Sequence, residues 1–97
     1  MVEHIVLFKW QPDATEAAIA DVLAALRGMV GKIPSIVALS CGENFSARSQ
    51  GFTHGLVVRF HDRQGLADYQ PHPLHQEIIA TKIKPILAET LAVDYDC

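Results

Sequence analysis

The 97-residue sequence predicts an α+β domain built on one four-stranded antiparallel sheet, with its helices on one face. Two observations predict this class. Four segments are rich in alternating β-branched and aromatic residues, and two other segments place apolar residues at three- and four-residue spacing. The helical segments separate the first strand from the second and the third strand from the fourth. A chain of this length fits a single domain, residues 1–97.

The first strand is predicted at residues 4–10, where both alternating sets of side chains are mostly apolar, so that both faces must be covered. A helix follows, with Asp13 as the predicted N-cap and Glu16 as the N3 residue of a capping box. Pro34 lies just beyond its predicted end. The helix is expected to cover one face of the sheet with an apolar stripe: Ile19, Val22, Leu23, Leu26 and Val30.

The second and third strands are predicted at residues 35–41 and 52–60, with a polar loop between them. In the third strand His54 shares its face with an otherwise apolar row of side chains.

Asp62 is the predicted N-cap of a short helix that stops near Pro71. A further helical stretch begins at about Pro73, and Pro85 kinks or ends it because proline lacks the backbone N–H. The last strand is predicted at residues 90–95. The resulting order, β-α-β-β-α-β, is the split-βαβ, ferredoxin-like arrangement.

The sheet face away from the helices is predicted to be apolar, and its apolar area is too large to be left exposed to water. A second copy related by a two-fold axis is the simplest cover. We therefore expect a homodimer whose two sheets face each other and form an α/β barrel, with His4 and His54 pointing into it. The residues expected on this face are His4, Val6, Phe8, Leu56 and Val58.

Composition excludes several classes of function. Residues are 49% hydrophobic and 20% charged, with a formal net charge of -3 and no basic run, so neither a nucleic acid nor a membrane is an expected partner. No apolar stretch approaches the ~20 residues of a membrane span, and no signal peptide is recognisable, which predicts a cytoplasmic protein. Cys41 and Cys97 lack the C-x-x-C spacing of zinc sites and redox pairs.

Four segments carry a family resemblance: residues 3–10 (EHIVLFKW), 51–56 (GFTHGL), 68–75 (DYQPHPLH) and 93–95 (VDY). Together they resemble the stress-responsive A/B barrel domain family, whose members are dimeric α+β barrels. One plant member of this family closes a linear polyketide by aldol condensation with a paired tyrosine and histidine. That pair corresponds to Tyr69 and His75 here, so the resemblance implies a lyase or cyclase that acts on a small carbonyl or polyketide-like compound.

The implied chemistry needs no metal and no cofactor. A neutral imidazole at His75 can remove an acidic proton next to a carbonyl, while the Tyr69 hydroxyl holds the imidazole or the enolate. Where the plant cyclase has aromatic residues this chain has Leu23 and Leu26, and Gln70 replaces an apolar residue, so the same substrate is not implied. The expected substrate-binding residues are His4, His54, His72, Leu23 and Leu26.

Structural roles are open for the same residues. His72 and His75 can bond backbone groups at a helix start, and His4 and His54 can satisfy each other or a trapped water. Tyr69 can pack its ring under the loop with its hydroxyl in solvent. The functional alternative is a non-catalytic stress-response or ligand-binding protein. The catalytic hypothesis predicts a solvent-accessible cavity with Tyr69 and His75 within hydrogen-bonding reach, whereas a filled barrel with His75 bonded to a backbone carbonyl would contradict it.

Two further possibilities follow from residue types alone. His72, His75 and Glu77 could ligate a metal, but their spacing does not match the common zinc patterns. Asp94 on the last strand is expected to pair with a neighbouring strand or subunit, and the sequence does not identify its partner.

Overall fold

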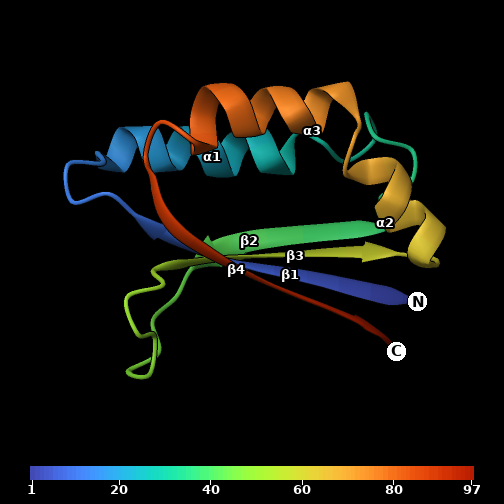
Figure 1. Cartoon of the computed structure of the whole chain (residues 1–97), viewed down its shortest axis with the longest axis horizontal. Coiled ribbons are helices and arrows are strands. Elements are labelled where there is room, and N and C mark those ends of the chain that lie inside the picture. The colour runs from blue at the N-terminus through green and yellow to red at the C-terminus, as the bar shows by residue number, and fades with distance from the viewer.

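The computed structural model describes residues 1–97 and confirms the predicted order of strands and helices. The strands form one antiparallel sheet in the order β2-β3-β1-β4, and the helices cover one face of it while the other stays open (Figure 1). The sheet does not close on itself, because β2 and β4 are its two edges. The elements are β1 (Val2–Trp10), α1 (Glu16–Arg27), β2 (Ala38–Glu43), β3 (His54–Phe60), α2 (Arg63–Tyr69), α3 (Pro73–Ile78), the π-helical turn η1 (Ile79–Ile83) and β4 (Leu87–Asp96).

Helix α1 begins later than predicted. Its N-cap is Thr15, whose hydroxyl accepts a hydrogen bond from the backbone N–H of Ala18 at 3.1 Å, so the predicted Asp13 cap is wrong. Aspartate and threonine are both good capping residues, and here a turn between residues 11 and 14 delays the first helical residue. The helix also ends at Arg27, which leaves the predicted stripe residue Val30 49% exposed.

The segment after β3 follows the predicted signals more closely. Asp62 caps α2 by accepting a hydrogen bond from the N–H of Gly65 at 3.0 Å. Proline at position 73 starts α3, where a missing N–H costs nothing. The helix then widens into η1, in which the N–H of Lys84 donates to the carbonyl of Ile79 at 2.9 Å, and it ends before Pro85.

The assignment of the two sheet faces was wrong. The side chains expected on the uncovered face pack against the helices instead: Phe8, Leu56 and Val58 are buried in the core with Leu26 of α1. His54 lies on this covered face as well, because it pairs with Phe8 in the register of β1 and β3. Alternation decides which side chains share a face, but in a strand apolar on both faces it does not decide which face the helices cover.

The open face is nevertheless apolar, as predicted for one face of the sheet. It carries the odd-numbered residues of β1 and their register partners on β3 and β4. Val57, Leu91, Val93 and Tyr95 are 36%, 48%, 46% and 48% exposed, respectively. The loop between β2 and β3 projects on the same side of the sheet, away from the helices (Figure 1). None of the helices has both the length and the apolar character needed to cross a bilayer.

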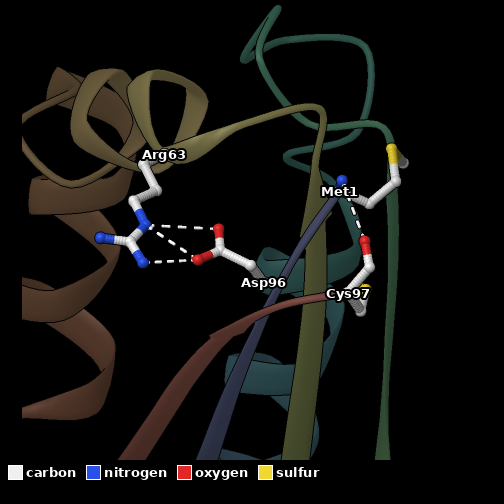
Figure 2. A network of polar contacts seen from close by, with 4 residues as sticks. All are labelled: Met1, Arg63, Asp96 and Cys97. Atoms are coloured by element: carbon white, nitrogen blue, oxygen red, sulfur yellow. Dashed lines mark hydrogen bonds and ion pairs between the residues drawn. The ribbon is translucent and has the colours of Figure 1, made fainter.

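The two ends of the chain lie side by side at one edge of the molecule (Figure 2). The N–H of Cys97 donates to the carbonyl of Met1 at 2.9 Å. Arg63 at the start of α2 donates from Nε to the Asp96 carboxylate at 3.1 Å, and this hydrogen bond holds the pKa of Asp96 below its ordinary value. These contacts anchor the end of β4.

Candidate functional site

A cavity of about 230 Å³ lies between the helices and the sheet, above β1 and β4. Its wall is mostly apolar, with polar groups from His4, Tyr69, His75 and Thr90. All of the lining residues belong to one chain and lie on the helical side of the sheet. The expectation of a pocket inside a barrel between two facing sheets is therefore wrong for this cavity. The apolar lining residues are Val6, Phe8, Leu26, Leu56, Ile79, Ile83, Leu87 and Ala92.

The cavity opens along β4. Thr90 and Ala92 line it and are themselves exposed, as is nearly all of this edge strand. The helices therefore leave the β4 side of the covered face accessible, and a small molecule can enter there.

Tyr69, the last residue of α2, forms part of the wall. Its side chain is 1% exposed, and its ring packs on Phe60 and His75 with centroid distances of 5.2 Å and 4.2 Å. The hydroxyl has no hydrogen-bond partner in the chain, yet it is not sealed off, because Ser35 Oγ is the only buried side-chain nitrogen or oxygen without a partner. Burial raises the pKa of Tyr69, so its hydroxyl is a neutral donor at the cavity surface.

His75 on α3 is held as a neutral imidazole with one free nitrogen. Its Nδ1 lies 2.9 Å from the carbonyl oxygen of Gln70, which can only accept, so Nδ1 carries the proton and Nε2 the lone pair. Burial lowers the pKa of His75, the backbone hydrogen bond opposes this, and positive charge at His4 or His72 lowers it further. The ring is therefore in the form that can accept a proton.

The Tyr69 hydroxyl and His75 do not form the expected hydrogen bond. Their rings pack against each other at a tilt of 36°, and both residues line the cavity.

His4 is the third polar group, and it has a partner that the sequence did not identify. Its Nδ1 contacts Oδ1 of Asp94, the residue directly opposite in the register of β1 and β4. His4 is 7% exposed and its ring meets the Tyr69 ring edge-on at 5.9 Å. Since the carboxylate accepts from Nδ1–H, Nε2 remains for the cavity. Only the strand register, which alternation does not reveal, could have identified Asp94.

The other predicted binding residues are distributed differently. Leu26 lines the cavity, whereas Leu23 and His54 line a second, separate one. His4 and His54 do not contact each other through hydrogen bonds, because Nδ1 of His54 is bonded to Trp10 and Thr53. His72 is the N-cap of α3, where it accepts from the N–H of Leu74 at 3.1 Å, and it lines neither cavity.

His72, His75 and Glu77 do not converge on a common point. No three His, Cys, Asp or Glu side chains in the chain are arranged to hold a metal ion. What the geometry assembles is a neutral donor at Tyr69, a proton acceptor at His75 and an oriented imidazole at His4, around an apolar cavity. Such a set can move a proton at a carbon atom and stabilise the oxygen that gains charge.

Comparison with known proteins supports the fold and the family. The family model described as Stress responsive A/B Barrel Domain matches residues 2–97. A stress-response A/B barrel domain-containing protein of Arabidopsis thaliana is 30% identical over 96 residues, which are 98% of this chain and 36% of that protein. The chain thus spans about a third of the length of this plant relative.

Olivetolic acid cyclase from Cannabis sativa is 26% identical over 76 residues, 76% of this chain and 75% of the cyclase. Among solved structures, a dimeric ferredoxin-like protein from Thermobifida fusca has a TM-score of 0.86 at 27% identity, covering 99% of this chain and 90% of that one. The family match extends over nearly the whole chain, and the fold agrees with it. The chain belongs to the stress-responsive A/B barrel domain family.

Proposed function

We propose that the chain is a cofactor-independent lyase or cyclase that acts on a small, largely apolar carbonyl compound. One observation carries the proposal: Tyr69 and His75 both line a mostly apolar cavity, and neither the Tyr69 hydroxyl nor Nε2 of His75 has a hydrogen-bond partner within the chain. Buried polar groups are normally satisfied within the protein, so unpartnered ones on a cavity wall mark a place for a ligand.

The proposed reaction begins with proton transfer. Nε2 of His75 takes a proton from the carbon next to the carbonyl, and the electron pair of the broken C–H bond moves to the carbonyl oxygen. The Tyr69 hydroxyl donates a hydrogen bond to this enolate oxygen. The enolate then forms a carbon–carbon bond to a second carbonyl of the same molecule, or expels a leaving group, and the histidine returns the proton to the oxygen that gains charge.

The cavity limits the size of the compound. At about 230 Å³ it is larger than the ~150 Å³ apolar cavity that takes up benzene, and smaller than most drug-sized sites. A single substituted ring or a short folded chain fits. Similarity to olivetolic acid cyclase supports the reaction class.

A homodimer through the open face belongs to the same proposal. The exposed apolar residues of β3 and β4 form one surface, and the similar Thermobifida fusca protein is dimeric. Two such faces packed through a two-fold axis would remove that surface from water.

A second candidate function is ligand binding without catalysis, as a carrier or stress-response protein. The observation that favours it is the ring packing of Tyr69 on His75, together with the Nδ1 contact to the Gln70 carbonyl. The same contacts would hold these rings as a rigid wall for a bound molecule.

The test is deuterium exchange at the α-carbon of phenylacetone in D2O, followed by proton NMR with histidine ring signals recorded in parallel. We expect the wild type to accelerate exchange, His75→Gln to fall to background and Tyr69→Phe to lose about 10²-fold or more. His61→Gln, at an exposed position outside the cavity, is the matched control and keeps full activity. Shifts of the His75 signals without α-carbon exchange would favour the carrier function. The absence of both the shifts and the exchange would overturn the assignment of this cavity as the site.

A further inference from the structure

A second cavity, of about 600 Å³, is lined by residues from the end of β1 and the start of α1. It shares no lining residue with the first cavity. Its wall combines an indole, an imidazole and two carboxylates with the apolar inner side of α1. The lining residues that matter here are Trp10, Glu16, Ile19, Leu23, Glu43 and His54.

The imidazole in this wall is locked in one tautomer. Trp10 Nε1 donates to Nδ1 of His54 at 2.9 Å, and the Thr53 hydroxyl lies 2.9 Å from the same atom. An indole N–H can only donate, so Nδ1 must hold the lone pair and Nε2 the proton. Nε2 has no partner in the chain and is not among the sealed atoms, so it is free to donate a hydrogen bond.

The indole is held equally firmly. One face of Trp10 stacks on Phe8 with a centroid distance of 5.1 Å and an interplanar angle of 7°. Its N–H is bound to His54, and the remainder of the ring borders the cavity. A preformed aromatic wall of this kind loses little conformational freedom when a ligand binds.

The charged residues that line the cavity are both acidic. Glu16 and Glu43 line it, neither forms an ion pair, and no lysine or arginine lines it. Glu43 is the register partner of His54, so both side chains leave the sheet on the covered face. Two uncompensated carboxylates beside an indole disfavour an anion and attract a cation.

We propose that this cavity binds a small organic cation, an ammonium group carried on an apolar ring or chain. Glu16, Glu43 and the Trp10 ring attract the charge, Ile19 and Leu23 contact the apolar part, and the N–H of His54 donates to any acceptor on the ligand. The site is independent of the proposed carbonyl chemistry, because it uses none of the same residues.

Trp10 is the only tryptophan in the chain and lines this cavity, so its fluorescence responds to a ligand bound there. Three probes of similar shape separate the contributions: 2-phenylethylamine as the cation, 2-phenylethanol as the neutral form and 3-phenylpropanoate as the anion. We expect a saturable fluorescence change with the amine and no saturation with the anion. The alcohol should bind roughly tenfold more weakly than the amine, which corresponds to about 1.4 kcal/mol.

Variants test whether the two carboxylates are responsible for binding the amine. Glu43→Gln and Glu16→Gln should each weaken binding of 2-phenylethylamine roughly 3–10-fold, as expected for partly solvated ion pairs. Two controls should leave the affinity for the amine unchanged. Glu77→Gln removes an exposed carboxylate outside the cavity, and Tyr69→Phe changes a residue of the other cavity. Equal binding of all three probes, indifference to both glutamate changes, or no saturation with the amine would overturn the proposal.

Discussion

The carboxylate of Asp94 contacts Nδ1 of His4 between directly paired residues of β4 and β1. His4 is buried, whereas the Asp94 side chain is 40% exposed at the sheet edge, so the pair runs from the outer edge into the wall of the cavity. An imidazole held in this way has a fixed ring orientation and a fixed proton on Nδ1. Asp94 is therefore a positioning residue for His4.

Replacing Asp94 by alanine should release this tautomer. We expect the ¹⁵N signals of the His4 ring to move from a single Nδ1–H form toward a mixture of both forms, because the acceptor for Nδ1–H is lost. Asp94→Asn should retain most of the wild-type signal, since its amide oxygen still accepts. Asp96→Ala, which removes a carboxylate bound to Arg63 instead, is the control. Unchanged His4 signals in Asp94→Ala would show that the contact does not orient the ring.

Tyr69→Phe should separate function from stability. The hydroxyl makes no hydrogen bond within the chain, so its removal should change the free energy of unfolding by no more than about 0.5 kcal/mol while it lowers α-carbon exchange. Tyr69→Ala, which also deletes the buried ring, should cost about 3–5 kcal/mol. Urea unfolding of both variants measures this. A loss above ~1.5 kcal/mol in the phenylalanine variant would mean that the hydroxyl has a partner in the fold.

Local signals predicted most of the fold and part of the site. Apolar spacing, the Asp62 cap and the prolines marked the elements, because each acts within a few residues. Tyr69 and His75, which lie on the consecutive helices α2 and α3, were identified only through the family resemblance of residues 68–75.

Pairings between distant residues could not be predicted. His4 and Asp94 are separated by 90 positions, and Trp10 and His54 by 44. Each pair depends on strand register, which the alternation of side chains does not determine when both faces of a strand are apolar. The same ambiguity in β1 led to the wrong assignment of the covered face, and with it to the expectation of a cavity between two sheets.

Stability should fall as the solution becomes mildly acidic. Burial lowers the pKa of His54 and of His75, so below the ordinary histidine pKa of about 6.5 the unfolded chain binds more protons than the folded chain. The free energy of unfolding therefore decreases as the pH falls from about 7.5 to about 5.5.

Urea unfolding at fixed protein concentration across this range measures the slope. His75→Gln should reduce the slope, because one of the two contributing rings is gone. His61→Gln, at an exposed position, should keep the wild-type slope. A slope that is the same in His75→Gln and in the wild type would contradict the assignment of a buried neutral ring at this position.

The open face of the sheet should be the dimer interface. Leu91 and Val93 of β4 lie beside β1 on this face, and a lysine at position 91 would place a charge in the interface once from each protomer. Because burial of an unpaired charge is costly, Leu91→Lys should convert a dimer into a monomer at micromolar concentration, as measured by size-exclusion chromatography with light scattering. Val30→Lys is the matched control, since Val30 is similarly exposed but follows α1 on the helical side, and this variant should remain dimeric. A monomeric wild type at micromolar concentration, or equal behaviour of the two variants, would exclude this face as the interface.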